Sequence, residues 1–102
     1  MTANTTPSPQ DKLFPTTKQE WLDFVATKRT TRFRPDEKLP VAVSMHNEMG
    51  IMVVRVVAVG KRDVTSLWEK RVKWDEVTEA DARAIATKAY DKLMKISNVV
   101  RQ

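Results

Sequence analysis

The sequence predicts an α+β domain of order α-β-β-β-α, with two helices packed on one face of a three-stranded antiparallel sheet. Two segments, one in the first third of the chain and one near its end, repeat apolar residues with the period of an amphipathic helix. Between them lie three stretches rich in β-branched residues and separated by short turns. This arrangement is typical of an antiparallel meander.

The chain has 102 residues, the size of one domain, and we expect residues 16–102 to form that domain. Residues 1–15, rich in Thr and Pro, bury too little apolar surface to offset their ordering entropy, so we expect a flexible tail. Nothing in the tail resembles a secretory signal, and the longest apolar run, residues 51–59, is too short for a membrane helix. These features predict a cytoplasmic protein, in its own cell or in a host cell, with no membrane partner.

The first helix is expected to begin at residue 16 or 17 and to run for about three turns. Thr17 and Glu20 form a capping-box pattern, in which a hydroxyl and a carboxylate satisfy backbone N–H groups at the start of a helix. Trp21, Phe24 and Val25 then fall on one stripe, which we expect to be buried.

Residues 40–47, 51–59 and 64–74 are the three predicted strands, and the last of them is irregular enough to suggest a bulge. Residues 47–50 form a hairpin connection whose glycine stands where a positive φ is needed. Residues 60–63 make the next turn.

Thr78 is the expected N-cap of the last helix, and Glu79 and Asp81 in its first turn complement the helix dipole. The apolar face of this helix comprises Ala82, Ile85, Ala86, Ala89, Leu93 and Ile96. One flank of that face carries a stripe of three lysines, Lys88, Lys92 and Lys95.

This order of elements resembles that of the double-stranded RNA-binding domain. Residues 22–29 are similar to the first helix of that family, residues 40–43 to its first strand, and residues 79–93 to its Ala-rich second helix. The resemblance spans most of residues 16–96 and implies the same fold.

The residues with which that family binds duplex RNA do not carry over. Its phosphate-binding lysines stand at the start of the second helix, where residues 78–83 are acidic here. Its Gly-rich third strand and Gly-His loop are also missing, and His46 falls in a strand. The resemblance therefore implies a degenerate duplex-RNA surface, as in members that have turned to protein contacts or dimerisation.

We expect no enzyme activity, no cofactor, no metal and no small-molecule substrate. The chain has no cysteine, and its single histidine, His46, has no nucleophile in a recognisable catalytic context. Four carboxylates cluster around the start of the last helix, where complementing the helix dipole explains them better than metal binding: Asp75, Glu76, Glu79 and Asp81.

The central strand is unusual because it is apolar on both sides. Met52, Val54, Val56 and Ala58 can meet the helices. The opposite side should be polar if it faces water, yet it carries Ile51, Val53, Arg55, Val57 and Val59. We interpret these five residues as a protein interface, with cover from within the domain as the alternative.

Positive charge gathers in two places, and the net charge of the chain is +5. The basic run after the first helix comprises Lys28, Arg29, Arg32 and Arg34, with Phe33 inside it. The last hairpin and strand contribute Lys61, Arg62, Lys70, Arg71 and Lys73, together with Trp68 and Trp74. Cations interleaved with aromatic rings are what single-stranded nucleic acid needs, although the size of the two tryptophans favours a place in the core.

The sequence thus gives two hypotheses. The first is a small basic nucleic-acid-binding module, for single strands or non-specific binding rather than for duplex RNA. The alternative is a protein-binding accessory or inhibitor, such as a phage might encode, which acts through the apolar sheet face as a homodimer or on a host protein.

Overall fold

The structure is a computed structural model that describes residues 14–101, with side chains from residue 14 to residue 98. Two helices and four strands follow one another along the chain: α1 (Lys18–Ala26), β1 (Thr31–Phe33), β2 (Val41–Glu48), β3 (Ile51–Val59), β4 (Val64–Lys73) and α2 (Glu79–Arg101). Up to residue 13, the expected flexible tail lies outside the described residues.

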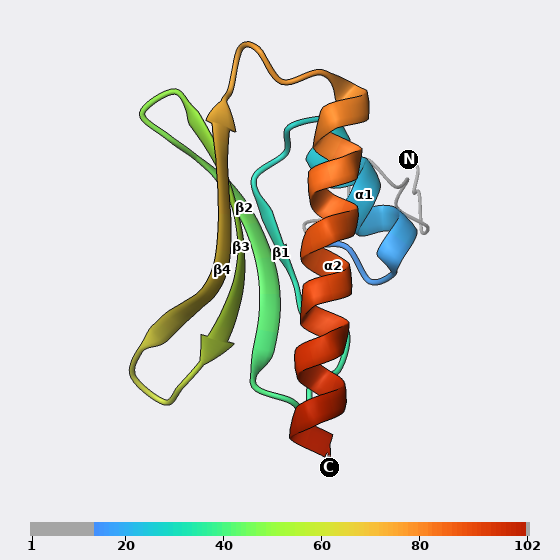
Figure 1. The fold of residues 1–102 in the computed structure, drawn as a ribbon, viewed down its shortest axis with the longest axis vertical. Coiled ribbons are helices and arrows are strands. Elements are labelled where there is room, and N and C mark those ends of the chain that lie inside the picture. The colour runs from blue at the N-terminus through green and yellow to red at the C-terminus, as the bar shows by residue number, and fades with distance from the viewer. Residues whose placement is uncertain (1–13, 102) are drawn as a thin grey trace, which may run out of the picture.

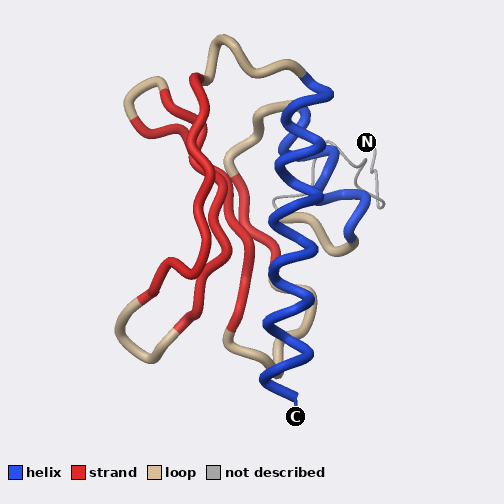
Figure 2. The backbone as a smooth tube through the Cα atoms, viewed as in Figure 1, coloured by secondary structure: helices blue, strands red, loops and turns tan. Residues whose placement is uncertain are grey.

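The four strands form one antiparallel sheet in the order β1-β2-β3-β4. Both helices lie against the same face of this sheet, which gives the molecule two layers (Figure 1, Figure 2). The α+β class therefore agrees with the sequence. The prediction of three strands is wrong, because the segment after the first helix contributes a fourth.

The additional strand, β1, is short and pairs with β2, so that Thr31 lies opposite Met45 and Phe33 opposite Val43. Thr31 and Phe33 are buried on the helix side, and Arg32 between them is exposed. In the sequence the segment therefore looks like the charged end of a helix. Its pairing with a strand that follows later in the chain is what makes it a strand.

The core lies between the sheet and the two helices. Trp21 of α1 is fully buried, and its indole Nε1–H donates a hydrogen bond of 2.9 Å to the backbone carbonyl of Ala86 in α2. Ala82, Ala86 and Ala89 are also fully buried, and their small side chains let α2 lie close to α1 and the sheet. Strands β2 and β3 supply the other side of the core, with Val41, Val43, Met45, Met52, Val54 and Val56.

The turn between β2 and β3 consists of Met49 and Gly50, and both have positive φ, 53° and 84°. Two positive φ values in a two-residue loop are characteristic of a type I′ hairpin, whose twist matches that of the strands. Asn47 accepts the Gly50 N–H through its side-chain oxygen at 2.9 Å. The positive φ predicted for this glycine is confirmed.

The pairing of β3 with β4 shifts register between Val56 and Val57, which confirms the irregularity expected in the last strand.

Thr17, just before α1, caps that helix by accepting the Glu20 N–H at 3.1 Å. The Glu20 carboxylate in turn accepts the N–H of Thr16 at 2.8 Å. No helix within residues 14–101 is both long and apolar enough to span a membrane.

Candidate functional site

The face of the sheet that points away from the helices, called the outer face below, carries a connected group of ion pairs. Arg55 of β3 contacts Glu69 of β4 at 2.9 Å, and Arg71 contacts the same carboxylate with its Nε. Glu48 of β2 lies 3.5 Å from Arg71 and 3.5 Å from the imidazole of His46. Hydrogen bonds from Arg71 and then Arg55 lower the pKa of Glu69, and the bond with Glu69 raises the pKa of Arg71.

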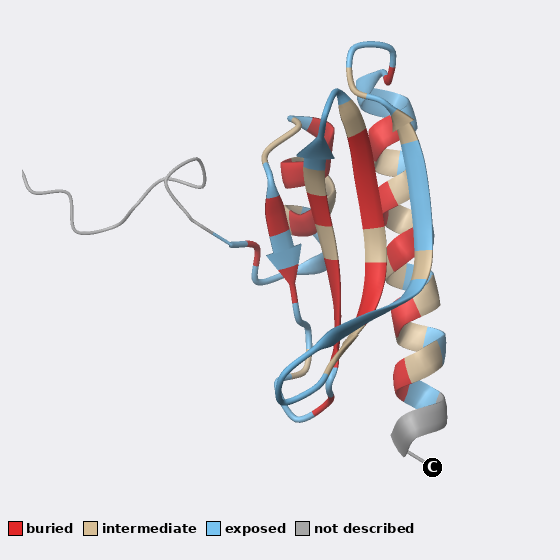
Figure 3. Cartoon of the chain, turned by 90° about the vertical axis from the view of Figure 1, so that its left-hand side faces the viewer, coloured by how far each residue is buried: buried red, intermediate tan, exposed pale blue. Residues whose placement is uncertain are grey.

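These side chains lie around the part of β3 that was predicted from the sequence to be a protein interface. Val53 is fully buried (0% exposed) although both helices of the described residues lie on the opposite face of the sheet (Figure 3). In the register, Val53 stands between His46 on β2 and Arg71 on β4, and long charged side chains can shield apolar surface with their stems. Val57 is 7% exposed, and Ile51 and Val59 are partly buried.

The basic run after α1 is largely occupied by contacts within the protein. Lys28 donates from Nζ to the backbone carbonyl of Trp74 at 2.6 Å, with its Nζ 5.9 Å from the centre of that indole ring. Arg34 donates to the carbonyls of Leu39 and Glu37, at 2.9 and 2.8 Å. These contacts give Lys28 and Arg34 structural roles.

The other members of this run lie against aromatic rings. Arg29 lies 4.2 Å from the ring centre of Phe24, and Arg32 lies 5.5 Å from that of Phe14. Phe33 is 5% exposed and stacks on Tyr90 of α2, which leaves little of its ring for a nucleic-acid base.

The second predicted cluster divides in two. Arg71 belongs to the outer-face ion pairs, and Lys73 pairs with Glu76 at 3.4 Å. Lys61 and Arg62 lie in the exposed turn between β3 and β4, and Lys70 lies on the helix side of β4; within the described residues these three make no ion pair. Trp68 and Trp74 are both partly buried against the core.

Strand β4 is the end strand of the sheet, ten residues long, and is exposed along most of its length (Figure 3). The Trp74 N–H donates to the carbonyl of Gly50 at 2.9 Å, and this fixes which groups of β4 point toward β3. Hydrogen-bonded and non-hydrogen-bonded pairs alternate in an antiparallel ladder. The backbone groups of Lys70 and Val72 therefore point toward β3, and those of Glu69 and Arg71 point outward, to an edge with no neighbouring strand among the described residues.

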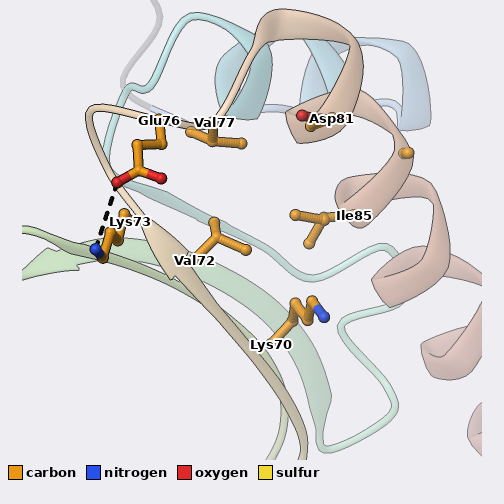
Figure 4. A pocket seen from close by; sticks show the side chains of 8 residues that line it. Lys70, Val72, Lys73, Glu76, Val77, Asp81 and Ile85 are labelled. Atoms are coloured by element: carbon orange, nitrogen blue, oxygen red, sulfur yellow. Dashed lines mark ion pairs between the residues drawn. The ribbon is translucent and has the colours of Figure 1, made fainter.

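A groove lies alongside this edge, between β4 and α2, and is called the edge groove below. It consists of two adjoining hollows of about 470 and 390 Å³ that share Lys70, Ala84 and Ile85. In Figure 4, Val72 of β4 and Ile85 of α2 project toward each other, and Lys70 reaches into the same space. The two hollows together are lined from β4 by Trp68, Lys70, Val72 and Lys73, and from α2 by Asp81, Ala84, Ile85, Thr87, Lys88 and Asp91, with Glu76 and Val77 from the connecting loop.

The two ends of the edge groove differ in chemistry. Around Val72, Val77 and Ile85 the wall is apolar, and the Lys73–Glu76 pair closes that end (Figure 4). Around Trp68 the wall carries Lys70, Lys88 and the carboxylate Asp91, and neither lysine has an ion-pair partner within residues 14–98. The sequence predicts Trp68 and Lys70 at a binding surface but not the helix wall, although the lysine stripe of α2 is visible in it.

The carboxylates at the start of α2 do not form a metal site in the described part of the chain, where no group of three or more His, Asp or Glu side chains could hold an ion. The backbone N–H of Asp81 instead donates a hydrogen bond of 3.1 Å to the side-chain oxygen Oγ1 of Thr78. Thr78 therefore caps the helix as predicted.

The chain matches no protein-family model, no curated protein and no solved structure. The similarity to the double-stranded RNA-binding domain therefore has no support beyond the sequence.

Proposed function

We propose that this protein binds an extended segment of another protein, which adds a fifth strand to the sheet at the β4 edge. The observation that carries the proposal is the open edge itself, with the backbone N–H and C=O groups of Glu69 and Arg71 directed away from the sheet. An extended chain laid beside β4 would satisfy these groups in a regular ladder.

The edge groove supports the same function. In binding by strand addition, main-chain hydrogen bonds supply affinity, and pockets that receive alternate side chains supply specificity. The side chains of Trp68, Lys70 and Val72 alternate along β4 on the groove side, so every second side chain of an added strand would face α2. This relocates the protein-binding hypothesis from the outer face, where Val53 is already buried, to the edge.

The proposal is tested by titrating the protein with a synthetic peptide of alternating Thr and Val while amide hydrogen exchange is followed by NMR. The amides of Glu69 and Arg71 should become protected when the peptide binds, because an added strand accepts their hydrogen bonds. The same peptide with proline at alternate positions cannot form the ladder and should protect neither amide.

A matched pair of variants tests whether the groove takes part. Ala84 and Ala80 are both exposed residues of α2, but only Ala84 lines the groove. Ala84→Trp should fill the groove and abolish peptide binding, and Ala80→Trp should leave it unchanged. Peptide binding that persists in Ala84→Trp would contradict a role for the groove, and peptide binding that protects no amide of β4 would contradict strand addition.

Nucleic-acid binding is the second candidate. It is favoured by cations of the β3–β4 turn, β4 and α2 that have no ion-pair partner among the described residues: Lys61, Arg62, Lys70, Lys88, Lys92 and Lys95. Trp68 lies in the groove beside Lys70 and Lys88 and could stack on a base. A single-stranded oligonucleotide should then quench tryptophan fluorescence, with an affinity that falls steeply as salt is added. Fluorescence that does not change at low salt would remove this candidate.

A further inference from the structure

We infer that the segment bound at the β4 edge is acidic and carries an apolar residue and a carboxylate two positions apart. This inference rests on the proposed function, the addition of a strand at that edge. Residues two apart in a strand point to the same side. One such pair of side chains would therefore reach both ends of the edge groove.

The position of each side chain follows from the lining of the groove. A side chain beside Val72 meets the hollow formed with Val77 and Ile85, where burial favours an apolar residue such as Leu. Two residues along the same side, a partner side chain lies beside Lys70 and within reach of Lys88 across the groove. A carboxylate there would pair with two cations that have no ion-pair partner within residues 14–98.

A second copy of this chain would place like charges at the axis in three of the central registers of β4. When two identical strands pair about a two-fold axis, the residue at the axis lies directly opposite its own copy. With Glu69, Lys70 or Arg71 at the axis, that residue meets a like charge, although with Lys70 there Glu69 lies opposite Arg71 on either side. Lysine and arginine on an edge strand are a common means of preventing self-pairing. A partner strand with carboxylates turns the same charges into attraction.

The experiment compares two labelled peptides by fluorescence anisotropy, both built on a polythreonine strand. One has Leu and Glu two positions apart, and the other has Lys in place of the Glu. The acidic peptide should bind the protein at least about threefold more tightly than the basic one, because a cross-strand charge pair replaces a like-charge contact. Equal affinity would overturn the inference and leave strand addition standing, whereas no binding of either peptide would overturn both.

A second experiment reverses the charge of single lysines in the protein. Lys70→Glu should weaken binding of the acidic peptide and strengthen binding of the basic one, and Lys88→Glu should act in the same direction. Lys61→Glu, in the β3–β4 turn away from the groove, changes net charge equally and is the matched control. Because Lys70, Lys88 and Lys61 are all exposed, the variants should fold, and circular dichroism checks this.

Two results would overturn the inference in this experiment. One is an equal effect of all three substitutions, which would show attraction to net charge instead of a specific site. The other is an oligothymidylate that binds more tightly than the acidic peptide and loses affinity in Lys70→Glu, which would assign the groove to nucleic acid.

Discussion

Arg55 and Glu69 lie directly opposite each other on β3 and β4, and the guanidinium Nε of Arg55 donates to the carboxylate of Glu69 at 2.9 Å. Arg71 approaches the same carboxylate from along β4, so that one acidic side chain joins two cations on neighbouring strands. The outer face thus carries paired charges of both signs. Val53, which lies on the same face, is buried without a second layer of structure over it.

The protein should lose stability in acid partly through Glu69. Its pKa is lowered in the folded state by hydrogen bonds from Arg71 and Arg55, below the ordinary value of 4.5. A group whose pKa is lower in the folded state stabilises the fold above its unfolded pKa, and that contribution is lost as the pH falls through the folded pKa. The melting temperature of the wild type should therefore fall below about pH 4.5, as thermal scans by circular dichroism can measure.

Glu69→Gln removes this titrating group and should make the acid branch of the curve shallower. Glu37→Gln is the control, because the Glu37 side chain is exposed and makes no ion pair among the described residues. If both variants follow the wild-type curve, Glu69 does not contribute to the acid sensitivity.

Val53→Asp should lower the free energy of unfolding by about 3 kcal/mol or more, because it places a carboxylate in a fully buried position. Val64→Asp makes the same substitution at an exposed position of β4 and should change stability little. Urea denaturation compares the two. A Val53→Asp protein that keeps wild-type stability while a dimer dissociates in light scattering would instead support the outer-face interface that the sequence predicts.

Trp21→Phe should cost about 1–3 kcal/mol, because the buried carbonyl of Ala86 loses the indole N–H that it accepts. The substitution also removes part of a fully buried ring. Trp68→Phe should cost less, since Trp68 is only partly buried and its indole makes no hydrogen bond within the described residues. Equal losses in the two variants would mean that the Trp21–Ala86 hydrogen bond contributes nothing.

Met49→Asn should stabilise the protein by about 0.5–1 kcal/mol. Met49 has a positive φ, which Asn tolerates better than Met, and Asn-Gly is the preferred pair in a type I′ turn. The Met49 side chain is 99% exposed, so no packing is lost. Gly50→Ala should act in the opposite direction, since an alanine at φ 84° is strained. A lower melting temperature for Met49→Asn would contradict this turn conformation.

Amide hydrogen exchange of the free protein should alternate along β4. The N–H groups of Lys70 and Val72 point toward β3 and should exchange slowly, whereas those of Glu69 and Arg71 point outward and should exchange at least about tenfold faster. NMR resolves each amide. Uniform protection of all four would mean that the edge is already paired in solution.

Local patterns in the sequence predict most of the elements. The capping residues Thr17 and Thr78 mark the starts of both helices, and the β-branched run of β3 with Gly50 before it defines the central hairpin. These features are local, in that each depends on residues a few positions apart. They suffice for the α+β class.

The missing parts depend on contacts between distant segments. β1 becomes a strand through β2, and Phe33 is buried because Tyr90 of α2 lies over it. Val53, buried on the outer face, lies opposite Arg71, a residue of another strand. The β4 side of the candidate site, with Trp68 and Lys70, can be predicted from the sequence. The α2 side cannot, because no pattern in the sequence places Ala84 and Lys88 across from them.

The Trp21–Ala86 hydrogen bond joins residues 65 positions apart, the first helix to the last. During synthesis, the strands emerge before α2, so the apolar face of β2 and β3 stays uncovered until Ala82, Ala86 and Ala89 have left the ribosome. A nascent chain that stops before α2 would expose that face and lack the acceptor for its buried indole. The core is therefore completed only when α2, the segment made last among those that build it, becomes available.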